Sequence, residues 1–231
     1  MTMQLPQQPV AQVQMPTLAI VAWMTSEIFA IAIAIGGAWW LDPPDSHWRP
    51  LILLAIGLIL YLVMIFLILR LLISRLQRMP DGPVPRSGSL KILYEWYRLL
   101  ACYHQWPLLV SNVLPVPVRT LVARWSGMRL GKGTLMGGRA MDVHWISCGR
   151  NCVIGLDALF SGHLLQPDGE HVARIVIGDN VLIGACAKIL PGVHIGNGAV
   201  VTIGSMVRGG TTIPPGETWG GVPARRLKSA E

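Results

Sequence analysis

Two histidines lie beside a long break in an otherwise regular part of this chain, and they are the first candidates for chemistry. His163 precedes the break and His171 lies within it. An imidazole titrates near neutral pH, so it can take a proton from an attacking hydroxyl or amine and return it to a leaving group. We therefore predict that His163 is a general base, with His171 as the fallback. His144 and His194 fit the surrounding pattern as outward-facing turn residues and are assigned no role.

Asp142 is the candidate partner of this base. It occupies a position at which the pattern otherwise places apolar residues, and a buried carboxylate is costly unless it is paired. It either orients a histidine or a backbone turn near the site, or it is exposed because the chain is irregular there. Arg139 and Asp157 fall at another pair of positions, where we favour a structural ion pair.

The pattern that positions these residues has a period of six, which neither an α-helix nor an isolated strand produces. Its apolar positions are Ile177, Ile183, Ile189, Ile195, Val201, Val207, Ile213 and Trp219, and the same phase runs backward through Phe160, Ile154, Cys148, Asp142, Met136 and Leu130. Such short repeats predict a parallel β-helix, in which three hexads form one coil and the apolar residues point inward. The count fails after Leu165, which predicts a loop insertion at residues 166–176.

The repeated motif [LIV]-G-x-x-[STAV]-x resembles the hexapeptide-repeat acyltransferase family, whose fold is a left-handed parallel β-helix. LFSGHLLQPDGE (159–170) is similar to the catalytic-histidine loop of that family, and IGSMVRGGTTIPPGETWGGVPAR (203–225) is similar to its acyl-CoA-binding C-terminal signature. VRTLVARWSGMRLGKG (118–133) resembles the start of the β-helix in membrane-associated members. The resemblance extends from Val118 to Lys228.

This resemblance implies an acetyl-CoA or other acyl-CoA co-substrate, no metal, and a homotrimer with active sites between subunits. It implies catalytic roles for His163 and Asp142. The residues expected to bind the acyl-CoA are Gly192, Gly204, Ser205, Arg208, Gly210, Trp219, Pro223, Ala224, Arg225 and Arg226. A core-capping role for Trp219 and a solvated tail for the terminal arginines are the alternatives.

Gly192 and Gly210 are included because of the eighteen-residue coil. With the insertion removed, they share one column with Trp145 and His163. Glycine lets a ligand approach the backbone closely, so this column predicts a track for the pantetheine arm. Simple turn geometry explains the same glycines.

The first third of the chain has the composition of a membrane segment. Mean hydropathy is +0.49 and only 13% of the residues are charged. Residues 18–41 and 51–69 are each long and apolar enough to cross a hydrocarbon core of about 30 Å. Glu27, within the first stretch, is a candidate functional carboxylate. The alternative places it near the interface, or protonated and bonded to a neighbouring chain.

The order of these segments predicts four regions. They are a loosely ordered N-terminus (1–17), a two-helix transmembrane hairpin (18–73), a juxtamembrane amphipathic helical linker (74–127) and the β-helix domain with its C-terminal tail (128–231). Arginines cluster after the second span, at Arg70, Arg75, Arg78 and Arg86, so the β-helix is expected on the cytoplasmic side of a bacterial inner membrane. Residues 90–121 either lie on the membrane surface or cover the first coil as an ordinary packing helix.

The net charge of +7 lacks the basic groove with interleaved aromatics that nucleic-acid binding requires. Anionic lipid and a phosphate-bearing donor account for it instead. Cys148 and Cys152 fall on inward positions of one hexad and are expected in the core.

The leading hypothesis is a membrane-anchored acyltransferase that acts on a membrane-associated, lipid-linked or saccharide acceptor. A non-catalytic trimeric membrane scaffold is the alternative. A metal enzyme of the γ-carbonic-anhydrase kind uses the same coil but needs three histidines around zinc. The sequence lacks the close histidine pair of such enzymes.

Overall fold

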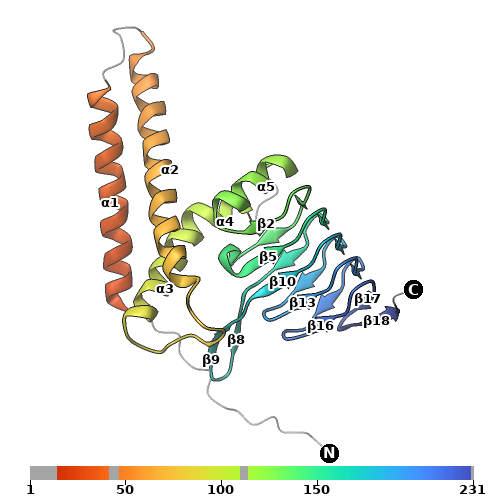
Figure 1. Cartoon of the computed structure of the whole chain (residues 1–231). Helices are drawn as coiled ribbons and strands as arrows, with labels where there is room; N and C mark the ends of the chain where they lie inside the picture. Colours follow the sequence, from red (N-terminus) through yellow and green to blue (C-terminus); the bar gives the residue numbers. More distant parts are fainter. Residues whose placement is uncertain (1–14, 42–46, 110–113, 230–231) are drawn as a thin grey trace, which may run out of the picture. The chain divides into compact units, whose positions relative to one another are not determined.

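The computed structural model describes residues 15–41, 47–109 and 114–229, which form two compact units (Figure 1). One unit is helical and comprises residues 15–78 and 87–107. The other comprises residues 79–86 and 108–229 and contains the repeats. The expected loose N-terminus lies mostly outside the described residues, because its first fourteen positions are not among them.

The helical unit consists of a helical hairpin and a third, shorter helical segment. Its elements are α1 (Thr17–Trp40), α2 (Arg49–Leu76), α3 (Ser89–Leu100) and a five-residue π-helical turn, η1 (Ala101–Gln105). Helix α4 (Trp106–Leu109) follows η1. Helix α3 packs against both α1 and α2.

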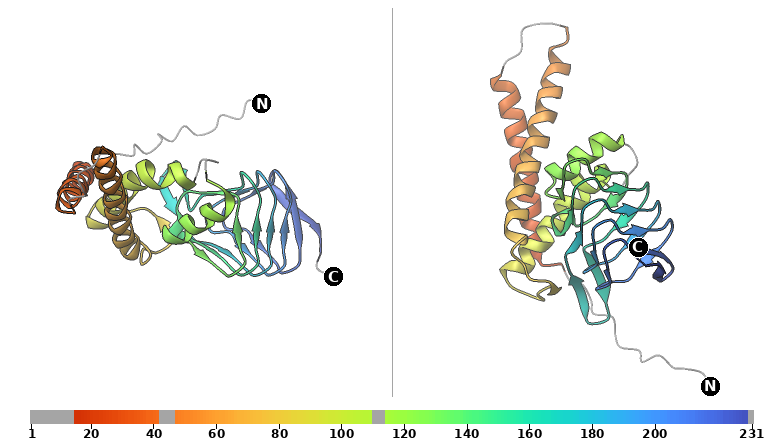
Figure 2. Two further views of the ribbon diagram at one scale, coloured as in Figure 1. Left: turned by 90° about the horizontal axis from the view of Figure 1, so that it is seen from above. Right: turned by 45° about the vertical axis from the view of Figure 1, so that its right-hand side comes forward.

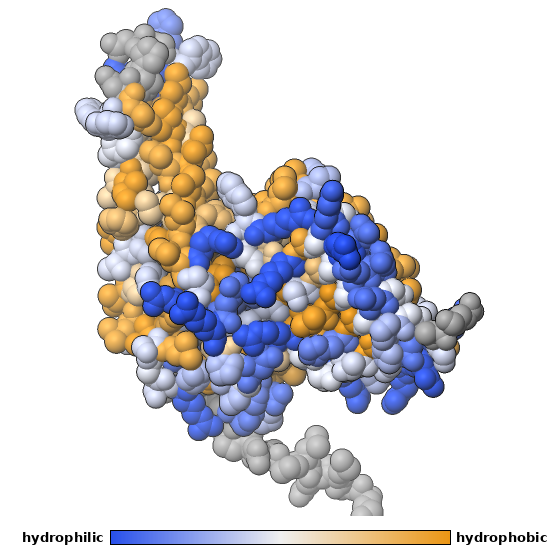
Figure 3. Space-filling model, viewed as in Figure 1, coloured by the Kyte–Doolittle hydropathy of each residue, from blue (hydrophilic) through white to orange (hydrophobic). Residues whose placement is uncertain are grey.

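Helix α1 of the hairpin has small residues on its packed side and large apolar residues outside. The side of α1 that packs inward carries Ala19, Ser26, Ala30, Ala34 and Ala38, whereas Ile28, Phe29, Ile31 and Ile35 are exposed. Small residues allow close packing of helices in a lipid environment. Figure 3 shows the resulting apolar surface along the two helices. Both helices are long and apolar enough to cross a membrane. Helix α1 covers the first predicted span except Leu41, and α2 covers the whole of the second.

The second unit is the predicted parallel β-helix. Its coils stack so that each short strand pairs in parallel with the strand one coil away, as in Ile183 with Val201 and Ile195 with Ile213 (Figure 2). The first sheet contains β2 (Arg129–Leu130), β5 (Ile146–Cys148), β10 (Ile175–Ile177), β13 (His194–Ile195) and β16 (Thr212–Ile213). The second contains β3 (Leu135–Met136), β6 (Val153–Ile154), β11 (Leu182–Ile183), β14 (Val200–Val201), β17 (Thr218–Gly221) and the antiparallel β18 (Ala224–Lys228). The third contains β4 (Arg139–Ala140), β7 (Leu159–Phe160), β12 (Lys188–Ile189) and β15 (Met206–Val207).

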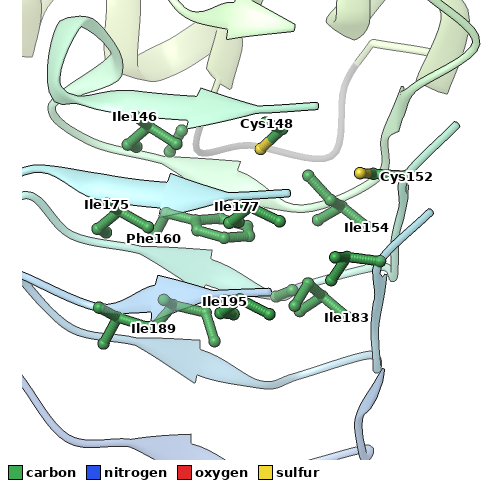
Figure 4. Packing of buried hydrophobic residues seen from close by; sticks show 14 of the residues in the cluster. Ile146, Cys148, Cys152, Ile154, Phe160, Ile175, Ile177, Ile183, Ile189 and Ile195 are labelled. Atoms are coloured by element: carbon green, nitrogen blue, oxygen red, sulfur yellow. The ribbon is translucent and has the colours of Figure 1, made fainter. Parts of the chain in front are cut away.

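The six-residue apolar ladder forms the core of this unit, as the sequence predicts (Figure 4). Each ladder residue from Ile177 to Ile213 is at most 3% exposed. Cys148 and Cys152 are buried among them, so their expected core role is confirmed. Gly184 shows why the corners need glycine, since a Cβ there would lie 2.4 Å from the backbone nitrogen of Ile203.

The segment expected as one amphipathic linker is divided between the two units. Helix α3 belongs to the helical unit, whereas α5 (Val116–Trp125) packs on the first coil. The buried Arg119 of α5 donates a hydrogen bond to the carbonyl oxygen of Gly137 (2.7 Å). The covering role proposed for this segment is therefore correct only for its second half.

The inserted loop has the predicted length but not the predicted position. Val176 lies within β10, where it pairs with His194 of the next coil. Phe160 pairs with Ile189. The coil that contains the insertion is therefore eleven residues longer than the regular coil that follows it, as predicted. The predicted range of the insertion, 166–176, is wrong.

The insertion is an antiparallel hairpin that leaves the coil two residues after Phe160. Its strands are β8 (His163–Gln166) and β9 (Gly169–Val172), and the Ala173 nitrogen donates to the Gly162 carbonyl oxygen at its base (2.9 Å). A hairpin must leave and rejoin the coil at neighbouring points. Counting residues fixes how many are extra, whereas strand pairing fixes where they lie.

Candidate active site

His163 is the first residue of the hairpin and lies at a corner of the coil. Strand β7 ends at Phe160, and Ser161 and Gly162 turn the chain into β8. The Ser161 hydroxyl donates to the carbonyl oxygen of His163 (2.8 Å), which fixes the backbone there. The His163 side chain is 21% exposed, so one edge of the ring is accessible.

Asp142 is the hydrogen-bond partner of His163. Its Oδ2 lies 2.6 Å from Nδ1 of His163 and accepts a second hydrogen bond from the Gly162 nitrogen (3.0 Å). Asp142 is only 4% exposed. A Cβ on Gly162 would lie 3.0 Å from the Asp142 Cβ, so glycine permits this close approach. Asp142 is thus buried and paired with a histidine, and its orienting role stays a prediction.

The charge state of this pair follows from its surroundings. Burial raises the pKa of Asp142. The hydrogen bond from His163 and the charges of the nearby imidazoles together lower it by more, so the net pKa is below its usual value. A carboxylate accepts hydrogen bonds, so Nδ1 of His163 carries a proton. The lone pair of the neutral ring is then on Nε2. This is the arrangement that a general base needs.

His144 lies close to the pair, and its predicted position is wrong. It is 5% exposed and packs against Trp145 with ring centroids 4.3 Å apart, not at an outward turn. The short helix η2 (Val143–Trp145) replaces the regular hexad at this point and turns the ring inward. Burial lowers the pKa of His144 to about 4.

The pKa of His144 predicts a pH-dependent stability. Its pKa is below the unfolded value of about 6.5, so the unfolded chain binds a proton that the folded chain does not. The contribution of neutral His144 to the free energy of unfolding should be fully present above about pH 6.5. The free energy of unfolding should then decrease by about 3 kcal/mol as the pH falls to about 4. Urea unfolding across this range measures the slope. His144→Phe keeps an aromatic ring beside Trp145 and should reduce the slope, and an unchanged slope would contradict the assignment.

The hairpin that begins at His163 is braced by residues 79–86. Strand β1 (Gly82–Pro83) pairs antiparallel with β9, and the sheet order is β1, β9, β8. Asp81 forms an ion pair with Arg174, and its Oδ2 accepts from the Arg174 nitrogen (3.2 Å). Arg174 also donates to the carbonyl oxygen of Met79 (2.9 Å). No local pattern in the sequence indicated this brace, because its partners lie 88 or more residues apart.

We expect Asp81→Ala to loosen the hairpin selectively. The variant removes a half-exposed ion pair and one hydrogen bond, together worth about 0.5–1.5 kcal/mol. Amide hydrogen exchange should therefore be roughly two- to tenfold faster at residues 163–172. Residues 182–213 serve as the internal control and should exchange at the wild-type rate. Equal acceleration in both segments would show general destabilisation instead.

The predicted glycine column is shifted by the true position of the hairpin. Gly192 lies beside Gly210, and a Cβ on Gly192 would be 3.3 Å from the Gly210 nitrogen and 3.5 Å from the Ala173 Cβ. The two glycines therefore stack as predicted, but the residue next to Gly192 is Ala173 rather than His163. The misplaced insertion caused this error.

The residues expected to bind acyl-CoA lie in two groups. Gly204, Arg208 and Gly210 are exposed on turns, whereas the Ser205 side chain is buried and bonded to Thr202 and Gly221. Any contact between Ser205 and an acyl-CoA would therefore involve the backbone of Ser205.

The second group lies on the last two strands. Trp219 is half-buried against the core and donates to Glu217 (2.7 Å), which also pairs with Arg226 (3.4 Å). The sequence did not single out Glu217. Pro223 and Ala224 are half-buried and Arg225 is exposed.

Two further predictions concern ionic groups. Arg139 and Asp157 form the expected ion pair, with Nε and Oδ1 3.5 Å apart. His171 bonds Asp168 at 3.0 Å near the outer end of the hairpin. Within the described residues, no three histidine, cysteine or acidic side chains gather as a metal site.

The repeats match a known family model. Residues 174–209 match the model described as bacterial transferase hexapeptide (six repeats). The prediction of a hexapeptide-repeat β-helix is thereby confirmed.

Two curated proteins are similar to part of this chain. The Bacillus subtilis (strain 168) protein YvoF, provisionally named an acetyltransferase, is 37% identical over 108 residues, which are 45% of this chain and 62% of YvoF. The 2,3,4,5-tetrahydropyridine-2,6-dicarboxylate N-acetyltransferase of Staphylococcus aureus (strain JH9) is 39% identical over 82 residues, 36% of this chain and 32% of the enzyme. The chain thus spans less than two thirds of either relative.

One solved structure is similar to part of this chain. The hexapeptide-repeat acetyltransferase VCA0836 of Vibrio cholerae O1 biovar eltor, complexed with acetyl coenzyme A, is 27% identical. The match covers 55% of this chain and 84% of that protein, with a TM-score of 0.45.

Proposed function

We propose that this protein is a membrane-anchored, acyl-CoA-dependent acyltransferase, with acetyl as the acyl group. The observation that carries the proposal is the hydrogen-bonded pair of the buried Asp142 and the partly exposed His163 at the base of the hairpin. The names of the similar curated proteins support the same activity.

The proposed reaction needs one proton transfer in each direction. Asp142 holds the proton of His163 on Nδ1, so the lone pair of the ring lies on Nε2, which takes the proton of an acceptor hydroxyl or amine. That oxygen or nitrogen forms a bond to the acyl carbon as its proton moves to Nε2. When the carbon–sulfur bond breaks, Nε2 returns the proton to the departing thiolate. The acyl thioester supplies the activated carbonyl.

The residues proposed to hold the donor match its chemistry. Arg208 and Arg225 are exposed and form no ion pair within the described residues, so their guanidinium groups are available to phosphate. Gly204 and Gly210 expose backbone at turns with positive φ. Gly192 stacks on Gly210, and Trp219 with the Pro223–Ala224 turn completes the proposed surface.

The acceptor is proposed to be presented at the membrane. Helices α1 and α2 would anchor the protein in a bacterial inner membrane, with the β-helix on the cytoplasmic side, where acyl-CoA is available. A membrane-associated lipid, a lipid-linked sugar or another saccharide fits this location. We propose a homotrimer in which neighbouring subunits complete each site.

Thiol release from acetyl-CoA by the purified full chain tests the proposal. The protein is assayed in lipid nanodiscs with soluble sugars in one arm and lipid-linked sugars in the other. We expect thiol release that requires an acceptor and is faster with the lipid-linked arm. Absence of acetyl-CoA binding by calorimetry would contradict the proposal and favour a trimeric scaffold.

A further inference from the structure

Three polar side chains meet inside the helical unit. Glu27 of α1 accepts a hydrogen bond from the Tyr61 hydroxyl of α2 (2.6 Å), and the same hydroxyl lies 2.7 Å from Nε2 of His104 in η1. Trp23 donates to the other oxygen of Glu27 (3.1 Å). Nδ1 of His104 lies 3.0 Å from the carbonyl oxygen of Leu100. These bonds join three separate helical segments.

The hydrogen bonds of this triad can be satisfied without a net charge. A carbonyl oxygen only accepts, so Nδ1 of His104 carries a proton. In one arrangement Glu27 is ionised, Tyr61 donates to it, and a cationic His104 donates to the Tyr61 oxygen. In the other, a protonated Glu27 donates to the Tyr61 oxygen, and Tyr61 donates to Nε2 of a neutral His104. Both satisfy every bond, and in both the triad has no net charge.

The depth of the triad follows from helix geometry. At 1.5 Å per residue, Tyr61 lies about 15 Å from the first residue of its apolar stretch (51–69) and about 12 Å from the last. Glu27 lies about 14 Å from one end of its stretch (18–41) and about 21 Å from the other. Both groups are therefore near mid-bilayer if the hairpin spans the membrane. His104 must reach the same depth because it bonds Tyr61 directly.

The chain order makes the third segment re-entrant. Residues 79–86 precede α3 and belong to the β-helix unit, and α5 of that unit follows α4. The chain therefore leaves the β-helix, reaches His104, and returns to the β-helix. A span that crossed the membrane would place the two parts of one folded unit on opposite sides.

Charged residues on α3 are paired, as this location requires. Glu95 is fully buried and contacts both Lys91 (2.5 Å) and Arg98 (2.8 Å). Charges inside membranes are expensive and occur in such pairs. Outward from the triad, Tyr103 is 60% exposed and stacks on Trp23, and Cys102 is also exposed. These side chains face the surroundings of the helices.

We propose that α3 and η1 form a re-entrant membrane element, held at mid-bilayer by the net-neutral Glu27–Tyr61–His104 triad, whose outer surface contacts lipid hydrocarbon. The inference rests on the membrane anchoring in the proposed function. It is independent of the acyl-transfer chemistry.

Native cysteines provide the test. The full chain is reconstituted in phosphatidylethanolamine and phosphatidylglycerol vesicles and treated with a membrane-impermeant maleimide. Cys186→Ser leaves Cys102 as the accessible thiol, and Cys102→Ala leaves Cys186. Maleimides react with the thiolate form of cysteine, and a hydrocarbon environment suppresses formation of the thiolate. We therefore expect Cys102 to react at least roughly tenfold more slowly than Cys186. Equal rates would overturn the proposal.

A matched pair of tyrosine variants tests the triad. Tyr61→Phe removes the hydroxyl that joins Glu27 to His104, and we expect faster labelling of Cys102. Tyr103→Phe removes a neighbouring hydroxyl but keeps the stack on Trp23, so labelling should stay slow. Protection of Cys102 in both variants would overturn the role of the triad. Buried Cys148 and Cys152 should stay unlabelled, which shows that the β-helix remains folded.

A further cysteine separates failure of this inference from failure of the anchor. Trp48 lies in the connection between α1 and α2. The new thiol of Trp48→Cys should react only with maleimide on the side of the membrane opposite Cys186. If both react from one side, the proposed membrane anchoring is wrong, and the re-entrant element with it. If sidedness holds while Cys102 reacts freely, only the present inference is wrong.

Discussion

Replacing His163 by glutamine is expected to lower kcat for acyl transfer by a factor on the order of 10³, within the range of about 10²–10⁴ that general-base catalysis contributes. Glutamine retains much of the volume and can still donate to Asp142, but its amide does not accept a proton at neutral pH. The measurement is thiol release from acetyl-CoA at saturating acceptor. Calorimetry should show acetyl-CoA binding within about twofold of wild type, because the imidazole acts on the acceptor proton.

The matched control is His171→Gln. This histidine belongs to the same hairpin but bonds Asp168 at its outer end. The control should keep nearly full activity. Equal loss in both variants would indicate a disturbed hairpin, and a fully active His163→Gln would exclude His163 as the base.

The second large effect is expected for Asp142→Asn. The amide still offers an oxygen to Nδ1 of His163 or to the Gly162 nitrogen, but it carries no charge and can also present its NH₂ group to the ring. In a well-studied carboxylate–histidine pair, this change selects the wrong tautomer and costs about 10⁴ in kcat. We expect a loss of about 10²–10⁴ here, with little change in KM for acetyl-CoA.

Asp157→Asn provides the control for this variant. Asp157 pairs with Arg139 in a half-exposed ion pair, so its loss should leave kcat unchanged. A second readout separates orientation from folding. Because the pKa of Asp142 is below its usual value, its stabilising contribution is present above about pH 4 and is lost as the pH falls further. Asp142→Asn should lack this acid-sensitive component, and wild-type kcat in this variant would contradict the orienting role.

The proposed anchor and the proposed site are joined by a short segment of the chain. Residues 77 and 78 separate α2 from the segment that supplies Asp81 and β1 to the brace. The five Cα–Cα steps of extended chain from Gln77 to Gly82 span at most about 18 Å. A truncation that removes the chain from its N-terminus through Asp81 would therefore delete part of the support for His163 as well as the proposed anchor.

The sequence by itself determined the β-helix, because burial of one residue in six is a local pattern that repeats. It also determined the number of inserted residues, and it indicated His163 and Asp142, since a histidine at a break and a carboxylate in an apolar ladder are departures from that pattern. The two apolar helices followed from composition in the same way.

Only the tertiary structure decided which groups touch. The location of the hairpin depends on strand pairing, so the predicted range and the glycine column beside His163 were both displaced. The Asp81–Arg174 brace spans 93 residues, and Tyr61 lies 34 residues from Glu27 and 43 from His104. No local period encodes such pairs. They form because the stacked coils and packed helices bring distant polar groups together, and the buried groups among them require such partners.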